Sequence, residues 1–289
     1  GIQLLHADGT RAMIHAGLAG RLASVPVLWH VRVLGSDGLL DRMLARISTR
    51  VLVNSDAVAR RFDFMKALSS SDGPTVIPNG VELESFARAT RDPVLRRQWG
   101  LEGKFALLML AQLIPWKRQD LAIQILSLLR DRGLNARLVL VGDEVATSRG
   151  ERARLEELAR RLGVDGDCVF AGFRRDVPQV LKQADLLLHT ARDEPFGRAL
   201  IEAMASSLPV VAAAGGGVEE VVEDGLTGVV VRSNSPEAWV GAIEKLYQDP
   251  PLRRQMGTAG RLRAEELFSI ESHVAGVERV YEEVLSSGQ

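Results

Sequence analysis

Short runs of apolar residues alternate with amphipathic stretches along almost the whole chain. Stretches 117–132 and 151–163 carry apolar residues at three- and four-residue spacing, which predicts helices. The apolar runs predict strands at 2–6, 26–31, 50–54, 74–77, 105–111, 137–141, 167–171, 185–188, 209–213 and 228–231. This alternation predicts an α/β fold of doubly wound, Rossmann-like parallel sheets, which bind ligands beyond the carboxyl ends of their strands.

The pattern also predicts two domains. Residues 1–85 contain few strands and predict a partial first domain, and 86–103, with its prolines, glycines and mixed charges, predicts a linker. Residues 104–265 predict a complete six-stranded domain. Residues 266–289 predict a helix that returns to the first domain, with Ser269 as its N-cap. Because a strand follows directly after Gly1, we expect the first domain to lack its N-terminal part.

Composition narrows the choice of partner and compartment. A chain of 289 residues, 46% hydrophobic, has room for two domains with sizeable cores. Its net charge of -1 does not favour a nucleic-acid partner. The single cysteine, Cys168, excludes an internal disulfide framework and favours a buried core position. No apolar run approaches the roughly 18 residues of a membrane span. We expect a cytoplasmic protein.

A row of arginines leaves open whether the protein contacts a membrane surface or a charged acceptor. Arg42, Arg46 and Arg50 follow an i, i+4 spacing on a predicted helix, and Arg60 and Arg61 come after it. Such a stripe suits a peripheral contact with the inner face of an anionic membrane, or a charged acceptor. A solvated helix face is an equally good interpretation.

The segment 193–205, DEPFGRALIEAMA, carries the most informative chemistry. Gly197 is expected to open a helix after strand 185–188, and free amides at a helix N-terminus can hold an anion. Glu194 and Glu202 could face the same cleft, where carboxylates suit adjacent sugar hydroxyls. A solvated helix position for Glu202 is the alternative.

At this point the sequence resembles a known family. EPFGRALIEAMA followed by LPVVAAAGGGVEEVVEDGLTGVVV is similar to the Glu–x7–Glu and glycine-rich signature of glycosyltransferase family 4, retaining enzymes of the GT-B fold. Further matching segments lie in the same order: VPVLWH, VLVNS, VIPNGVELESF, AQLIPWKRQDLAI, LVLVGD and VFAGFRRDVP. The resemblance implies a GT-B fold of two Rossmann-like domains, the first being an incomplete acceptor side.

The resemblance also implies roles for single residues. Glu202 would bind the ribose hydroxyls of a nucleotide and Glu194 those of the donor sugar. Lys117 would be the cation on the diphosphate. The remaining implied donor contacts are the amides around Phe196, Gly197 and Arg198, the second cradle of Gly216, Gly217 and Glu220, and Phe173 and Arg174 near the base.

The resemblance differs at Gln112, and Lys117, the glycines at 215–217 and His30 have competing interpretations. The family commonly has an arginine where this chain has Gln112, so donor affinity would depend more on Lys117. Without the motif, Lys117 would be an exposed first-turn lysine, and the glycines at 215–217 a helix-entry turn. His30 would position the sugar near its reacting carbon. A lone histidine in a strand is more often a core residue.

No metal or separate cofactor is expected. Asp165–Gly166–Asp167 matches a metal-binding Asp–x–Asp formally, but Asp-Gly is good turn chemistry and no Cys/His cluster accompanies it. The co-substrate implied by the resemblance is a UDP- or GDP-linked sugar.

The resemblance therefore predicts a retaining glycosyltransferase acting on a saccharide or lipid-linked acceptor. Two alternatives stay open: a sugar-nucleotide 2-epimerase on the same fold, and a non-catalytic nucleotide-sugar-binding fragment. On the expectation of a missing N-terminal part, the chain alone should bind donor and turn it over poorly or not at all.

Overall fold

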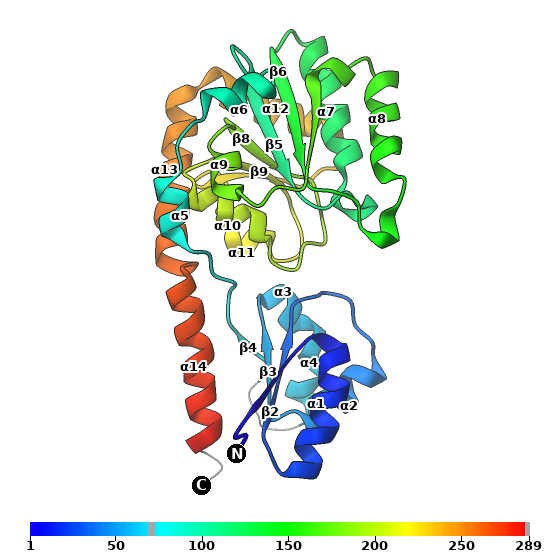
Figure 1. Ribbon diagram of the computed structural model, residues 1–289, viewed down its shortest axis with the longest axis vertical. Coiled ribbons are helices and arrows are strands. Elements are labelled where there is room, and N and C mark those ends of the chain that lie inside the picture. Colours follow the sequence, from blue (N-terminus) through cyan, green and yellow to red (C-terminus); the bar gives the residue numbers. More distant parts are fainter. Residues whose placement is uncertain (69–72, 287–289) are drawn as a thin grey trace. The chain divides into compact units, whose positions relative to one another are not determined.

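The computed structural model describes residues 1–68 and 73–286. The chain divides into two compact units (Figure 1). Unit 1 comprises Gly1–Gly80, Asp193–Phe196 and Leu267–Gln289, and unit 2 comprises Val81–Arg192 and Gly197–Glu266.

The described part of unit 1 is built on a parallel sheet in the order β1-β2-β3-β4. Its strands are β1 (Leu5–Asp8), β2 (Val27–Val31), β3 (Arg50–Val53) and β4 (Thr75–Val76). Its helices are α1 (Gly9–Ala23), α2 (Leu39–Ile47), α3 (Asp56–Ala59), α4 (Asp63–Leu68) and α14 (Ile270–Ser286), with a 3₁₀ turn at Arg60–Phe62.

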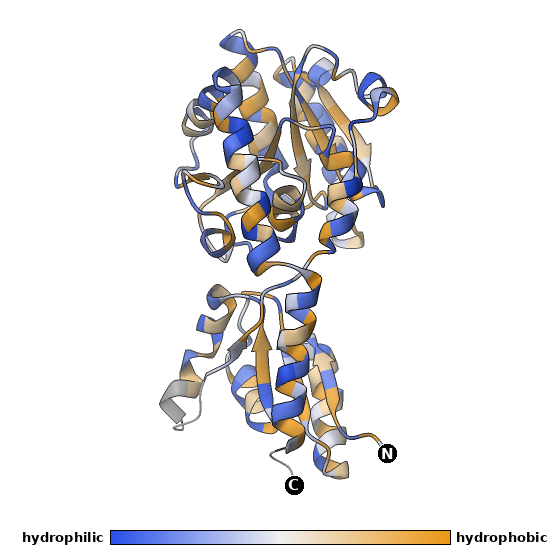
Figure 2. Ribbon diagram, turned by 90° about the vertical axis from the view of Figure 1, so that its left-hand side faces the viewer, coloured by the Kyte–Doolittle hydropathy of each residue, from blue (hydrophilic) through white to orange (hydrophobic). Residues whose placement is uncertain are grey.

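Alternate residues of β2 face opposite sides of this sheet. Val27, Trp29 and Val31 form a core with Met13 of α1 and Leu44 of α2. The other buried members of this core are Val51, Val53, Val58 and Phe62. Leu28 faces the other way and packs with Leu52, Ile77, Val280 and Val284, so α14 covers that face. Figure 1 shows α14 alongside this sheet, and Figure 2 shows largely hydrophobic strands beside helices of mixed polarity.

A buried ion pair fixes α2 to the segment after α3. Arg61 donates from Nε to Asp41 at 2.8 Å and from a terminal nitrogen at 2.5 Å, and both side chains are almost fully buried. Ser36 and the Asp37 amide also donate to Asp41. Burial alone would raise the pKa of Asp41, but these hydrogen bonds and the charge of Arg61 hold it below its usual range.

The prediction of an exposed row of arginines on a helix is therefore wrong for Arg50 and Arg61. Arg50 belongs to β3, because the helix ends at Ile47, and Arg61 is buried against Asp41 instead of facing solvent or a membrane. Arg42 and Arg46 remain exposed on α2.

Unit 2 contains a six-stranded parallel sheet in the order β10-β9-β8-β5-β6-β7. Its strands are β5 (Phe105–Leu110), β6 (Ala136–Val141), β7 (Cys168–Gly172), β8 (Leu186–His189), β9 (Val210–Ala213) and β10 (Gly228–Val231). Its helices are α5 (Leu83–Arg88), α6 (Pro93–Gln98), α7 (Gln119–Asp131), α8 (Glu151–Arg161), α9 (Val177–Leu181), α10 (Arg198–Ala205), α11 (Val218–Val221), α12 (Pro236–Gln248) and α13 (Pro250–Leu267).

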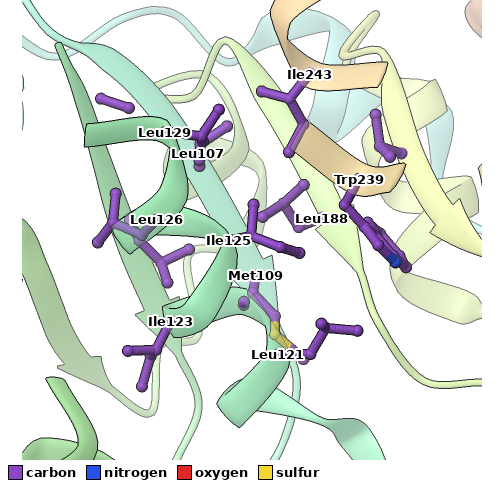
Figure 3. Close-up of a cluster of buried hydrophobic side chains, with 14 of the residues drawn as sticks. Leu107, Met109, Leu121, Ile123, Ile125, Leu126, Leu129, Leu188, Trp239 and Ile243 are labelled. Atoms are coloured by element: carbon purple, nitrogen blue, oxygen red, sulfur yellow. The ribbon is translucent and has the colours of Figure 1, made fainter. Parts of the chain in front are cut away.

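Helices cover both faces of this sheet. On one face, α7 packs against β6, and α12 packs against β9, β10 and α7. Their shared cluster includes Leu107, Met109, Leu126, Leu188 and Trp239 (Figure 3). On the other face, α10 packs against β8 and β9 and contacts α9 and α5. The two parallel sheets with covering helices confirm the predicted α/β fold class.

The predicted linker needs correction. Residues 86–103 belong to unit 2, which begins at Val81, and most of the expected linker's apolar side chains are buried there: Phe86, Leu95, Trp99 and Leu101. Asp92 caps α6 by accepting from the amides of Val94 and Leu95, with Pro93 at the first helical position. These helices are too short for a periodic hydrophobic signal. A second difference is that Asp193–Phe196 clusters with unit 1.

Candidate functional site

The order of strands in unit 2 creates a topological switch point between β5 and β8. The chain runs from β5 to β6 and β7 on one side, then from β8 to β9 and β10 on the other. Open α/β sheets bind ligands outside the carboxyl ends of the strands at such a point. The topology therefore predicts a ligand site at the loops that follow β5 and β8.

A buried threonine ties these two loops together. The Thr190 hydroxyl, just after β8, lies 2.8 Å from the carbonyl oxygen of Lys117 and 2.9 Å from that of Arg118. Gln119 Nε2 donates to the carbonyl of Gln112 at 2.7 Å. The segment 112–118 is thereby fixed above the sheet, with Gln112 exposed and Lys117 Nζ 4.0 Å from the centre of the Trp116 ring.

Glu202 is buried in α10, so a solvated helix position is the wrong interpretation. Gly197, at φ 95°, precedes the helix, as the sequence predicts. Glu202 is only 7% exposed, and Arg198 Nε donates to its Oε1 at 3.1 Å. Burial raises the pKa of Glu202, and the charge and hydrogen bond of the mostly exposed Arg198 oppose that shift. A carboxylate accepts up to about four hydrogen bonds, so Glu202 keeps capacity for ligand hydroxyls.

The glycine-rich loop after β9 contains one position that only glycine fits. Gly215 has φ 125°, and a Cβ there would lie 2.4 Å from the carbonyl oxygen of Arg192 in the loop after β8. Gly216 is also left-handed at φ 59°, and Gly217 precedes α11. Glu220 is half-buried in that helix. The loop therefore brings its backbone against the β8 loop.

Gly142 has a similar role after β6, which was not predicted from the sequence. A Cβ on Gly142 would lie 1.9 Å from the carbonyl oxygen of Ala111, and its amide donates to the carbonyl of Gly172 at 2.9 Å. The residue thus packs the ends of β5, β6 and β7 together. Its place directly after a predicted strand was a usable signal.

Phe173 and Arg174 follow β7. Phe173 is exposed. Arg174 forms two hydrogen bonds to Asp176, at 2.8 and 2.5 Å, and its guanidinium carbon lies 5.9 Å from the centre of the Trp99 ring. The charge of Arg174 is therefore already paired within unit 2.

Glu194 and Phe196 cluster with unit 1. Glu194 is 8% exposed, and the neighbouring Pro195 carbonyl accepts from the Ser55 hydroxyl at 2.6 Å. The Phe196 ring is buried edge-on against Phe268, with 5.7 Å between ring centres. The Phe196 side chain is therefore a packing group.

His30 is fully buried on the face of β2 that α14 covers. Its Nδ1 lies 3.2 Å from His6 Nε2 and 3.4 Å from Arg32. Burial first, then the charges of Arg32, His6 and His273, lower the pKa of His30 to about 3, so it is neutral at physiological pH. Of this group only His30 was predictable from the sequence, because its partners lie on the distant elements β1 and α14.

Across the described residues, no group of three or more His, Cys, Asp or Glu side chains has the arrangement of a metal site. Asp167, of the formal Asp–x–Asp, pairs with Lys104 and Arg137. No described helix has both the length and the apolar character needed to cross a membrane. In unit 2, a buried carboxylate, a lysine and glycine-rich backbone converge at one sheet edge, which suits an anionic ligand rich in hydroxyls.

Comparison with known proteins gives this edge a context. The family model "Glycosyl transferases group 1" matches residues 92–263. D-inositol 3-phosphate glycosyltransferases of Salinispora arenicola and Thermobifida fusca are 28% and 29% identical to the chain, each over 99% of it. The chain spans 65% of the length of each of these relatives.

Solved structures are similar as well. The crystal structure of Anabaena HepE in complex with UDP and glucose has a TM-score of 0.87 and 26% identity, over 97% of this chain and 77% of that one. Sucrose-phosphate synthase from Thermosynechococcus elongatus shares the fold, with a TM-score of 0.84 and 22% identity, over 99% of this chain and 75% of that one. The fold is of the GT-B type.

Proposed function

This chain belongs to the glycosyl transferases group 1 family, and on that premise we propose that it catalyses the transfer of a sugar from a nucleotide-sugar donor with retention of configuration, as family 4 enzymes do. The acceptor we propose is a saccharide or a lipid-linked saccharide. Because the Anabaena relative was crystallised with UDP and glucose, UDP-sugars are the first donors to test and GDP-sugars the second.

One observation carries the proposal: the β5 and β8 loops are locked together at the switch point, next to a buried carboxylate. In the proposed complex, Lys117 lies on the diphosphate and Glu202 accepts from the ribose hydroxyls. The amides of Gly197 and Arg198 bind the diphosphate, where a helix N-terminus favours negative charge.

The other proposed contacts extend from this centre. Glu194 accepts from hydroxyls of the donor sugar. Gly216, Gly217 and Glu220 form a second backbone cradle near the sugar or the phosphate. Phe173 offers an exposed ring to the base, and His30 helps to position the donor sugar. These groups bind and orient, and Lys117 offsets the charge that grows on the departing diphosphate.

The test is product analysis by mass spectrometry and NMR, with UDP- and GDP-sugars supplied together with saccharide acceptors. We expect free nucleoside diphosphate and an extended saccharide whose new linkage keeps the anomeric configuration of the donor. An isomerised sugar nucleotide would support the epimerase instead, and tight binding without either product would support the non-catalytic module.

Replacing Lys117 with Gln is expected to weaken binding of UDP by roughly 1 kcal/mol, about fivefold, at low salt. The loss should shrink as salt rises, because a half-exposed charge pair is screened. Calorimetry at two ionic strengths measures it.

Lys245→Gln is the matched control, since Lys245 is an exposed lysine on α12 and should leave UDP affinity unchanged. Gln112→Arg in the Lys117→Gln background should restore part of the affinity by returning a cation to the same loop. A loss that is equal at both ionic strengths would contradict a charge contact.

A further inference from the structure

A chain of polar contacts links the surface of unit 1 to the buried His30. Tyr281 of α14 lies 2.6 Å from His6 Nδ1, and His6 Nε2 lies 3.2 Å from His30 Nδ1. Arg32 approaches the same His30 Nδ1 at 3.4 Å and is paired with Asp8 at 3.6 Å. These residues come from β1, β2, the residue following β2 and α14.

Arg32 sets the direction of the hydrogen bonds that connect it with His30, His6 and Tyr281. A guanidinium has only donors, so the His30 Nδ1 beside it must be an acceptor. His6 must then donate from Nε2, and its own Nδ1 accepts from the Tyr281 hydroxyl. In the neutral His30 ring the proton consequently sits on Nε2.

The remaining neighbours agree with this assignment. His273 of α14 stacks on His30, with 6.4 Å between ring centres, and its Nδ1 donates to the Pro78 carbonyl at 2.7 Å. It therefore leaves the His30 nitrogens to the other groups. Burial, together with the charges of Arg32 and His273, lowers the pKa of His6, and the charge of Asp8 opposes this shift. The lowered pKa favours the neutral His6 ring that these hydrogen bonds require.

The buried Nε2 of His30 has no hydrogen-bond partner among the residues that the structure describes. A buried donor without an acceptor is costly, and such groups mark sites where a fold retains a polar atom for function. A ligand oxygen would satisfy it.

We propose that Tyr281 and His6 are positioning residues for His30: together with Arg32 they direct its proton to Nε2, so that His30 is an uncharged hydrogen-bond donor and not a base. The part of the inference that concerns transfer rests on the proposed function. The tautomer itself does not depend on it.

The first test is ¹⁵N NMR of the imidazole nitrogens in the whole chain at pH 7, with the five histidines assigned by single substitutions. We expect a protonated Nε2 and an unprotonated Nδ1 for His30. A proton on Nδ1, or on both nitrogens, would overturn the proposal whatever the enzyme activity.

The second test is Tyr281→Phe, which removes one hydroxyl and keeps the ring. We expect the ¹⁵N resonance of His6 Nδ1 to shift as this nitrogen loses its hydrogen bond, and kcat for sugar transfer to fall roughly 2- to 12-fold, the size of one ordinary hydrogen bond, with an unchanged melting temperature. Tyr247→Phe is the matched control, because Tyr247 is the chain's other tyrosine and packs against Phe105 in unit 2.

An unaltered His6 spectrum and an unaltered kcat in Tyr281→Phe would overturn the positioning role. A fall in kcat that follows a lowered melting temperature, with the His6 resonances unchanged, would assign Tyr281 to packing alone and also overturn it. Absence of transfer by the wild-type chain would contradict the proposed function only, since the His30 and His6 spectra still decide this inference.

Discussion

Replacing Asp41 with Asn is expected to destabilise unit 1 by about 3–5 kcal/mol, the usual cost of breaking a buried ion pair, since the other carboxylate near Arg61, Asp37, is exposed and lies 3.6 Å away. The Arg61 side chain is only 1% exposed and lies against the Trp29 and Phe62 rings, so it cannot reach water without repacking. Hydrogen exchange of the β2 and β3 amides reports this loss within unit 1.

Two further variants separate the ion pair from general disturbance. Asp41→Leu combined with Arg61→Met should recover much of the lost stability, because apolar replacements of both partners leave no buried charge. Glu84→Gln, which breaks the exposed pair with Arg88, should cost under about 1 kcal/mol. A loss that persists in the double variant would show that the charges are not the cause.

Asp41→Asn should also change how the stability of unit 1 depends on pH. The pKa of Asp41 is lower in the folded protein than in the unfolded chain. Its contribution is therefore complete above the unfolded pKa and is lost as the pH falls through the folded value. In Asp41→Asn this part of the acid dependence should be absent, which an acid titration of the exchange rates would measure.

The sequence predicted the strands of unit 2 well because both faces of its sheet are buried. Runs such as 105–111 and 137–141 are continuous and apolar, and they correspond to β5 (Phe105–Leu110) and β6 (Ala136–Val141). The cap of α14 was also readable: the Ser272 amide donates to the Ser269 hydroxyl at 3.0 Å. Both signals are local.

Features made by distant residues were not predictable in the same way. Arg61 has the surroundings of a surface residue in the sequence, and only the fold brings it to Asp41. His6 and Tyr281 are separated by 275 positions, so no spacing rule connects them. The short helices α5 and α6 resembled a linker because their burial depends on side chains elsewhere in unit 2. The family motif favoured a ligand-binding role for Glu202 over a solvated helix position, and the burial of Glu202 agrees with that choice.

Glu202→Ala is expected to weaken binding of UDP by about 1.5–3 kcal/mol, roughly 10- to 150-fold, because it removes a buried hydrogen bond to a charged group. Glu194→Ala should leave UDP binding nearly unchanged and weaken binding of UDP-glucose by a similar amount. The reason is that the proposed contact of Glu202 is with the ribose, whereas that of Glu194 is with the sugar. Calorimetry with both ligands on both variants measures the two losses.

The controls must show that α10 remains packed, since Glu202 lies among buried residues of that helix. Glu202→Gln keeps the shape and one acceptor oxygen while removing the charge, so its loss should fall between those of wild type and Glu202→Ala. Glu156→Ala, which removes an exposed glutamate paired with Arg152 on α8, should leave both affinities unchanged. Equal losses of UDP binding in Glu194→Ala and Glu202→Ala would refute the division between ribose and sugar. Preserved UDP binding in Glu202→Ala would remove the Glu202 carboxylate from the donor site, because no other carboxylate is proposed to contact the ribose.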